Sequence, residues 1–160
     1  MDSVREICYK ARQASYDLAM CDAQAKNRAL QAIADRIEAD ADEILRANAL
    51  DLQQASEIGS AMQDRLRLTP QRIAAMAQGV REVAQLPDPV GTVVREFTRP
   101  NGLRIRKVRV PFGVIGVIYE ARPNVTADVA ALCLKSGNCV VLRGGKEAIH
   151  SNRALARIVA

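Results

Sequence analysis

The sequence predicts an α/β fold: amino-terminal helices, a β-hairpin, and then a partial Rossmann-like parallel βαβα unit. Three observations lead to this prediction. Apolar residues recur at helical spacing over residues 1–86, a basic alternating stretch spans residues 91–110, and two short β-branched runs flank a helical pattern within residues 111–160. The 160 residues are 49% hydrophobic, which is enough to form the core of one ordinary domain.

The helical lead-in is predicted from apolar spacing and from helix caps. Apolar side chains recur every three or four residues in three successive stretches, residues 2–20, 24–39 and 41–56. Asp2 or Ser3 is expected to cap the first of these helices. Glu6 stands three residues after Ser3, which is the spacing of a capping box. The charged residues between the apolar positions are interpreted as solvated faces.

The last helix of the lead-in has a clear start. A short helical turn is expected around residues 62–66. Thr69 is then followed by Pro70, and this pair places a good N-cap residue before a proline that suits the first helical position. Pro87 and Pro89 end this helix and form a stiff linker. We therefore expect the main internal boundary of the chain at these prolines.

The next stretch is predicted to form a basic β-hairpin. Residues 93–98 and 103–110 have the character of strands, and Pro100-Asn101-Gly102 forms the turn between them. Its basic residues are Arg95, Arg99, Arg104, Arg106, Lys107 and Arg109. A sheet edge protected by charge explains them. A nucleic-acid groove is the alternative, but Phe97 is the only ring in the hairpin on which a base would stack.

The last part of the chain is predicted to be a partial dinucleotide-binding unit. Buried parallel strands are expected at residues 114–118 and 139–142, with a helix between them and another helical pattern after them. Asn124 or Thr126 is expected to cap the helix between the strands, and Gly137 is expected to end it in the left-handed conformation. Because ligands collect at the carboxyl ends of parallel strands, the turns after both strands form the candidate site.

Both of these turns carry polar and charged side chains. They are Glu120, Arg122 and Asn124 after the first strand, and Arg143 and Lys146 around a glycine pair after the second. Paired glycines let a ligand approach the backbone, and a helix start offers free N–H groups to an anion. Arginine and lysine beside that start suit the phosphate of a sugar. The alternative is that Gly144 and Gly145 only turn the chain and that both cations are solvated.

Three segments between residues 111 and 152 carry a family resemblance: PFGVIGVIYEARPN, LKSGNCVVLRGGKEA and HSN. They resemble the gamma-glutamyl phosphate reductases, a branch of the aldehyde dehydrogenase superfamily. The resemblance implies NADPH-dependent reduction of L-glutamyl 5-phosphate to L-glutamate 5-semialdehyde with release of phosphate, in proline biosynthesis. It also implies a cofactor domain, a catalytic domain with a nucleophilic cysteine, and a hairpin through which subunits form a homo-oligomer.

The resemblance also implies cofactor-binding residues. Residues of the second turn fall where the superfamily binds the adenosine ribose: Arg143, Gly144, Gly145 and Lys146. Residues at the end of the first strand fall where the superfamily's strand flanks the cofactor: Ile118, Tyr119 and Glu120. The two cations of the second turn are expected to favour NADP over NAD by binding its 2′-phosphate.

Arg122 and Asn124 are the catalytic residues that the resemblance implies. The superfamily has an oxyanion-stabilising Asn in this turn, and ungapped counting from Gly113 puts Arg122 at its position. Two roles stay open, with Asn124 donating to the oxyanion or Arg122 binding the leaving phosphate. The structural alternative is that Asn124 only caps the following helix.

No cysteine of the sequence matches the family's catalytic motif. The cysteines are Cys8, Cys21, Cys133 and Cys139, and the two later ones are interpreted as small core residues. The sequence also stops within an apolar helical run that ends at Ala160. We therefore expect this chain to be the amino-terminal, cofactor-binding part of a longer enzyme, without its catalytic domain and inactive by itself.

Composition restricts the alternatives. The net charge is +5, from 23 basic and 18 acidic residues, a mild excess that an anionic substrate or cofactor explains as well as nucleic acid does. There is one His and no CxxC pair, so no metal site is predicted. A disulfide framework is not predicted either, because the sequence has no signal peptide. A signal peptide and an apolar stretch of membrane-spanning length are both missing, and we expect a cytoplasmic protein. The alternative function is a non-catalytic assembly or nucleic-acid-binding module that uses the basic hairpin.

Overall fold

The computed structural model describes residues 3–55 and 59–160. Helices come first: α1 (Val4–Ala19), α2 (Ala23–Ala39), α3 (Ala41–Gln54), α4 (Ser60–Leu66) and α5 (Pro70–Gln85). The hairpin strands follow, β1 (Val93–Thr98) and β2 (Arg104–Val108). The chain then forms β3 (Val114–Tyr119), α6 (Asn124–Lys135), β4 (Cys139–Gly144), the 3₁₀ helix η1 (Lys146–Ala148) and α7 (Ile149–Val159). The predicted α/β fold class is confirmed.

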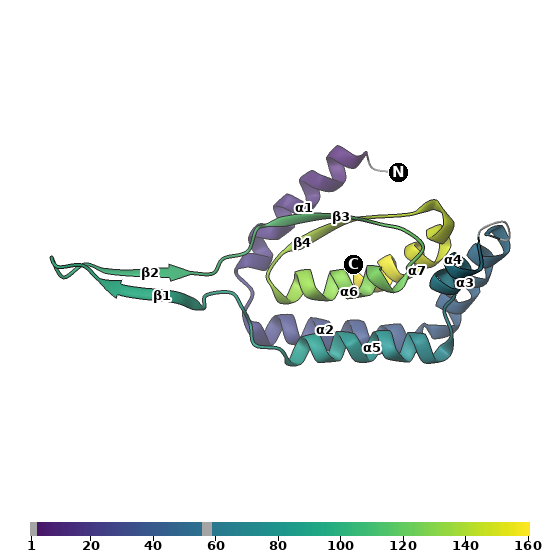
Figure 1. The fold of residues 1–160 in the computed structure, drawn as a ribbon, viewed down its shortest axis with the longest axis horizontal. Helices are drawn as coiled ribbons and strands as arrows, with labels where there is room; N and C mark the ends of the chain where they lie inside the picture. Colours follow the sequence, from purple (N-terminus) through teal and green to yellow (C-terminus); the bar gives the residue numbers. More distant parts are fainter. Residues whose placement is uncertain (1–2, 56–58) are drawn as a thin grey trace.

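The parallel strands β3 and β4 lie in the middle of a layered arrangement. They pair in register from Val114 opposite Cys139 to Tyr119 opposite Gly144. Helix α6 packs against the strand pair, and the antiparallel α2 and α5 lie beyond α6, while α1 contacts both strands from the other side in the view of Figure 1. Helices α3, α4 and α7 gather near the carboxyl ends of the strands (Figure 1). The predicted βαβα unit therefore forms, with the lead-in helices wrapped around it.

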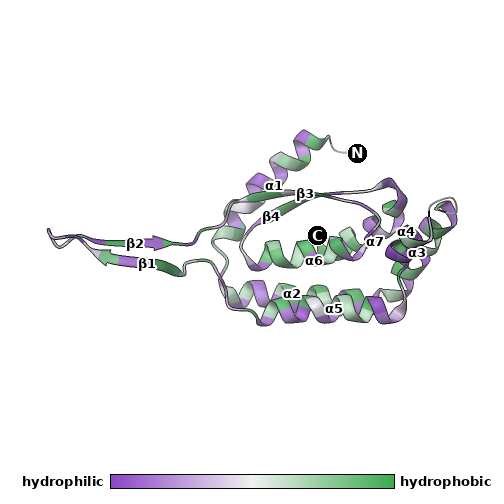
Figure 2. Ribbon diagram, viewed as in Figure 1, coloured by the Kyte–Doolittle hydropathy of each residue, from purple (hydrophilic) through white to green (hydrophobic). Residues whose placement is uncertain are grey.

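A continuous apolar core joins the lead-in to the parallel unit. The buried side chains of this core come from α2, α3, α5, α6, α7 and the segment before α5, and include Leu30, Ile37, Ile44, Ile73, Val80 and Leu155. Figure 2 shows the apolar residues of α2, α5 and α6 on the sides where these helices face one another. Full burial of one such side chain stabilises a fold by about 1.5–3 kcal/mol. Among the described residues, no helix has the length and apolar character needed to cross a membrane.

The local start signals of α1 and α5 are confirmed. Ser3 accepts from the Glu6 N–H and Glu6 accepts from the Ser3 N–H, which completes the predicted capping box. Asp2, the other candidate cap, lies outside the described residues. The Thr69 hydroxyl accepts a first-turn N–H of α5 at 3.2 Å, and Pro70 occupies the first helical position.

The predicted cap of α6 by Asn124 or Thr126 is wrong. Pro123 holds the N-cap position in a helical conformation, with φ −56° and ψ −34°, and no side chain caps the first turn. First-turn N–H groups donate instead to the carbonyls of Arg122 and Pro123 at 3.0 Å, in a tight 3₁₀-like start. The Asn124 amide donates to Asp128 Oδ2 at 2.9 Å. Asn124 therefore does not cap α6, and the structural alternative to its predicted catalytic role is wrong.

The end of α6 follows the prediction. Gly137 adopts a positive φ of 74°, and the Asn138 N–H donates to the Cys133 carbonyl at 2.8 Å, as in a Schellman motif. A Cβ at Gly137 would lie 2.9 Å from Pro111 Cγ. Both the backbone conformation and the close packing at this corner therefore require glycine.

The first turn of α7 is capped by a carboxylate from a distant helix. Asp51 of α3 is 1% exposed and accepts the N–H groups of His150 at 3.0 Å and Ser151 at 2.8 Å, together with the Ser151 hydroxyl at 2.6 Å. Buried Asn48 donates to Ser151 Oγ at 3.0 Å and accepts the Leu68 N–H at 2.7 Å. This network fixes α7 relative to α3 and to the segment before α5.

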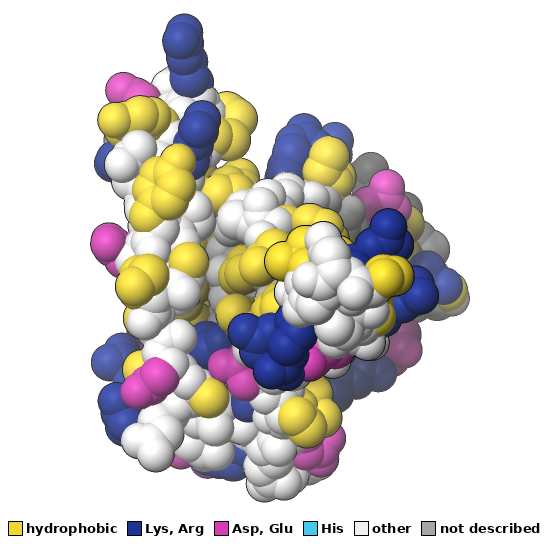
Figure 3. All heavy atoms as spheres, turned by 90° about the vertical axis from the view of Figure 1, so that its left-hand side faces the viewer, with side chains coloured by type: hydrophobic (Ala, Val, Ile, Leu, Met, Phe, Trp, Pro, Cys, Tyr) yellow, Lys and Arg dark blue, Asp and Glu magenta, His cyan; other side chains and the backbone are white. Residues whose placement is uncertain are grey.

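The predicted hairpin is confirmed and extends away from the rest of the molecule (Figure 1). Phe97 lies opposite Ile105, and the Arg95 guanidinium stands 5.2 Å from the Phe97 ring centroid. An ion pair joins Arg104 to Glu96 across the strands. All residues of β1 and β2 are exposed, and seen from this end of the molecule hydrophobic and basic side chains both reach the surface (Figure 3).

Replacing Asp51 with Ala should lower the free energy of unfolding by about 2–4 kcal/mol, because it leaves buried N–H and hydroxyl donors of α7 without an acceptor. Urea denaturation followed by circular dichroism measures this loss. Asp17→Ala, at an exposed position of α1, is the control and should change stability by less than about 0.5 kcal/mol. Equal stability of the two variants would contradict the capping role of Asp51.

Candidate functional site

The turns after β3 and β4 are in direct contact. The Ala121 N–H, in the first turn, donates to Glu147 Oε1, just after the second turn, at 2.6 Å. The strand ends beside them also pair, with Tyr119 opposite Gly144. The structure therefore brings together the two turns that the sequence marked as a candidate site. Glu147 was not predicted, because a glutamate near a helix start has no feature that indicates its partner.

The two glycines of the second turn make room for side chains of the chain itself. A Cβ on Gly144 would lie 2.0 Å from Asn152 Nδ2, and a Cβ on Gly145 would lie 2.0 Å from Glu147 Oε1. Asn152 Nδ2 is buried and has no hydrogen-bond partner among the described residues. These contacts support the view that the glycines shape the turn, and a role in cofactor binding stays a prediction.

The two cations of the second turn are exposed. Within the described part of the chain, neither Arg143 nor Lys146 has a hydrogen bond or ion pair from its side chain. Arg143 is the outward-facing residue near the end of β4, and Lys146 begins η1. Both charges are therefore available to an anion, as a contact with a cofactor phosphate requires.

Of the three residues at the end of β3, two are exposed and one turns inward. The Ile118 side chain is 76% exposed, and Glu120 is exposed as well. Tyr119 turns inward, and its hydroxyl lies 2.6 Å from Thr126 Oγ1. Burial raises the pKa of the Tyr119 hydroxyl, although the bond to Thr126 opposes this shift. Strand alternation explains the difference, since neighbouring side chains emerge on opposite faces.

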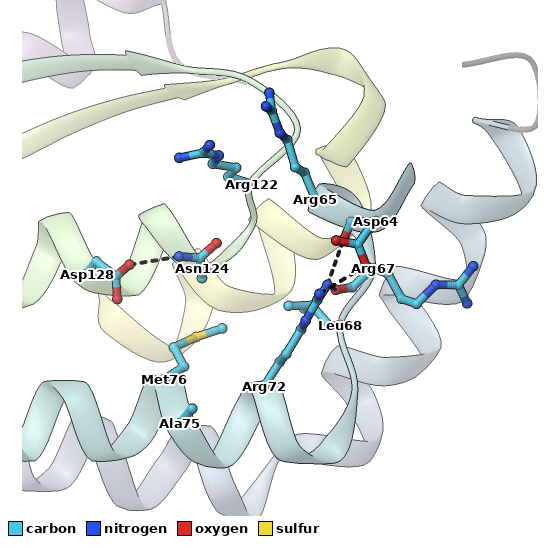
Figure 4. Close-up of a pocket in the computed structure, with 10 residues that line it drawn as sticks. All are labelled: Asp64, Arg65, Arg67, Leu68, Arg72, Ala75, Met76, Arg122, Asn124 and Asp128. Atoms are coloured by element: carbon cyan, nitrogen blue, oxygen red, sulfur yellow. Dashed lines mark hydrogen bonds and ion pairs between the residues drawn. The ribbon is translucent and has the colours of Figure 1, made fainter. Parts of the chain in front are cut away.

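Arg122 and Asn124 line a cavity of about 520 Å³ between the start of α6 and the α4–α5 segment (Figure 4). The other charged groups that line it include Asp64, Arg65, Arg72 and Asp128. None of the residues from Arg143 to Lys146 lines this cavity. The structure thus places both predicted catalytic residues together and places the predicted phosphate-binding turn beside them.

Only some of the arginines at the cavity have partners. Arg72 bonds to Asp64 Oδ1 at 3.0 Å and to the Arg67 carbonyl at 2.7 Å, and it supports the segment between α4 and α5. Arg65 and Arg122 are exposed, and neither side chain has a partner among the residues that the structure describes. Arg65 was not predicted as a site residue, because an exposed arginine on a short helix looks like a solvated surface residue in sequence.

Asp128 is the half-buried acid of the cavity. Burial raises the pKa of its carboxyl, and the hydrogen bond from Asn124 partly opposes this shift. The bond orients the Asn124 amide, which still has a second N–H and a carbonyl oxygen for a ligand. Asn124 is therefore held in place on the cavity side of α6.

The cysteines of the parallel unit are poor nucleophiles. Burial raises the pKa of the Cys133 thiol, and the nearby Cys139 raises it further. Burial also raises the pKa of Cys139. Each shift leaves less thiolate at neutral pH. Cys133 is buried, as predicted, and Cys139 is half-buried.

Comparison with known proteins shows the family and the shared fold of this chain. The aldehyde dehydrogenase family matches residues 1–160. The chain belongs to this family, whose membership implies a nicotinamide cofactor, NAD or NADP. A NAD-dependent benzaldehyde dehydrogenase from Corynebacterium glutamicum is 24% identical and superposes with a TM-score of 0.70 over 93% of the chain, which shows a shared fold.

Particular relatives are much more similar. The gamma-glutamyl phosphate reductases of Xanthomonas axonopodis pv. citri and Enterococcus faecalis are each 55% identical, over 97% and 98% of the chain. Solved structures of gamma-glutamyl phosphate reductases from Thermotoga maritima and Saccharomyces cerevisiae have TM-scores of 0.95 and 0.93, at 42% and 38% identity, and both alignments cover 99% of this chain. The chain spans 38% of the two bacterial relatives and 39% and 41% of the two solved chains. The resemblance predicted from residues 111–152 is confirmed.

Stability should depend on pH through Asp128. Its pKa is higher in the folded protein, so its contribution to stability is greatest below the unfolded pKa of about 3.9 and is lost as pH rises through the folded-state value. Asp128→Asn does not titrate, so its free energy of unfolding relative to the unsubstituted protein should increase between about pH 3 and pH 7. Urea denaturation across this range, with Asp17→Asn as the exposed control, measures the effect. A difference that is independent of pH would contradict the assignment.

Proposed function

We propose that this chain supplies the amino-terminal, cofactor-binding part of an enzyme that reduces L-glutamyl 5-phosphate to L-glutamate 5-semialdehyde with NADPH and releases phosphate, in proline biosynthesis. The observation that carries this proposal is the 55% identity to gamma-glutamyl phosphate reductases over 97% of the chain. It is supported by the site, where Arg122 and Asn124 line a polar cavity next to the carboxyl ends of the parallel strands.

The NADP preference is proposed to come from Arg143 and Lys146. NADP differs from NAD by a 2′-phosphate, and two unpaired cations at the end of a parallel strand match that charge. Gly144 and Gly145 shape the turn that presents them, while Ile118, Tyr119 and Glu120 flank the same strand end. The bound cofactor supplies a hydride, and this chain's residues hold and orient it.

Arg122 and Asn124 are proposed to face the reacting acyl group. Arg122 is suited to bind the phosphate of the acyl phosphate, because its guanidinium is free and offers paired N–H donors. Asn124 is suited to donate to a developing oxyanion, because its amide does not cap α6 and is oriented by Asp128. The catalytic cysteine is proposed to come from a catalytic domain outside this chain.

The hairpin is proposed to join subunits of a homo-oligomer. Its strands are exposed along their whole length and carry exposed apolar side chains, among them Val94 and Val108. In this proposal, residues 1–86 form a helical lead-in, 91–110 the oligomerisation hairpin and 111–160 the partial dinucleotide-binding unit. The free cysteines fit a reducing cytoplasm.

The function is tested in a chimera that joins this chain to the remaining part of the Xanthomonas axonopodis relative. NADPH-dependent reduction of L-glutamyl 5-phosphate is expected.

In this chimera, Arg143→Ala combined with Lys146→Ala should raise KM for NADPH by about tenfold and leave KM for NADH unchanged, because the lost contacts involve only the 2′-phosphate. Arg153→Ala, an exposed arginine of α7, is the matched control. An unchanged preference for NADPH would remove the two cations from the cofactor site. Salt-dependent RNA binding without NADPH binding would favour the nucleic-acid module instead.

Arg122→Ala in the same chimera should raise KM for L-glutamyl 5-phosphate by about tenfold, because a charge-assisted contact with the phosphate is lost. KM for NADPH should stay the same. Steady-state kinetics with each substrate varied in turn separates the two constants. An unchanged KM for the acyl phosphate would show that Arg122 is outside the phosphate site.

A further inference from the structure

The cavity lined by Arg122 has a second unpaired arginine on its other wall. Arg65 belongs to α4 in the helical lead-in. In the sequence it lies well before residues 111–152, on which the family resemblance rests. Figure 4 shows the Arg65 side chain extending from α4 toward the turn that carries Arg122, and the Arg122 side chain extending above α6. In the same view Arg67 points away from them, and Arg72 points to Asp64.

The backbone around Arg65 is held from two directions. Buried Asn48 donates to the Leu66 carbonyl at 2.8 Å and accepts the Leu68 N–H at 2.7 Å. On the other side, Arg72 donates to the carbonyls of Asp64 and Arg67. Leu66 itself is fully buried. The segment that carries Arg65 is thus preorganised, which lowers the entropic cost of using its side chain to bind a ligand.

The charges of this cavity favour an anion with several oxygen atoms. Arg65 and Arg122 each present a planar set of N–H donors that fits two oxygens of a phosphate or carboxylate. Among the described residues no carboxylate pairs with either of them, whereas Arg72 is neutralised by Asp64. A ligand oxyanion between Arg65 and Arg122 would receive donors from both walls of the cavity.

We propose that Arg65 is a substrate-binding residue that, together with Arg122, holds an anionic group of the substrate, either its phosphate or its carboxylate. The identity of the substrate rests on the proposed function. The oxyanion site itself rests on the positions and free charges of the two arginines. A neutral substrate would offer Arg65 no oxyanion to bind. Arg65 therefore contributes to the specificity for an anionic substrate.

The proposal is tested on the chain itself by NMR, using the side-chain Nε–Hε signals of arginine during titration with inorganic phosphate and, separately, with L-glutamate. Phosphate should shift the signals of Arg65 and Arg122 with one common Kd. Arg65→Ala should weaken this Kd by about threefold to tenfold. Arg65→Lys should restore part of the affinity, since it keeps the charge and loses the paired donors. Arg153→Ala, at an exposed arginine of α7 that does not line the cavity, is the matched control and should leave Kd unchanged.

Each outcome decides the assignment. A larger response to phosphate assigns the pair to the phosphate group, and a larger response to L-glutamate assigns it to a carboxylate. If the Arg65→Ala and Arg153→Ala variants bind phosphate equally well, or if phosphate shifts the signal of Arg122 and not that of Arg65, the proposal is wrong. Failure of the chimera to reduce L-glutamyl 5-phosphate while the NMR response persists would overturn the proposed function and leave the oxyanion site in place. Since Arg65 is exposed, its substitution should not change the free energy of unfolding, which urea denaturation verifies.

Discussion

The buried carboxylate of Asp51 is the interaction on which the rest of the site depends. It satisfies the first N–H groups of α7, a helix with no capping side chain of its own. Fixing the start of α7 also fixes η1, and with it Glu147, which accepts the Ala121 N–H and joins the two turns. Arg122 follows Ala121 directly, so its position depends on the Asp51 carboxylate of the helical lead-in.

The same network reaches the opposite wall of the cavity. Asn48, one turn before Asp51 on α3, binds both Ser151 of α7 and the backbone on either side of Arg67. The lead-in helices therefore do more than cover the parallel strands. They position an arginine-bearing segment across from the turn after β3, and the two together line an open cavity.

Most of the fold could be predicted because its signals are local. The capping box at Ser3, the Thr69-Pro70 start and the left-handed Gly137 each depend on a few neighbouring residues, and each was confirmed. The predicted cap of α6 was wrong because Pro123 adopts a helical conformation and begins the turn itself. For the candidate site, the sequence identified both turns and their charges, but it could not indicate Arg65 or Glu147, whose roles depend on contacts with distant segments.

The sequence by itself determined the order of helices and strands, the hairpin, the parallel unit and the family, because periodicity, caps and motif spacing are properties of short stretches of chain. Only the tertiary structure decided which side chains meet. Asp51 caps a helix 100 residues away, and Glu147 binds a backbone N–H 26 residues before it. Such contacts form only when the apolar core brings these segments together, and a solvated carboxylate has the same sequence appearance as a buried cap.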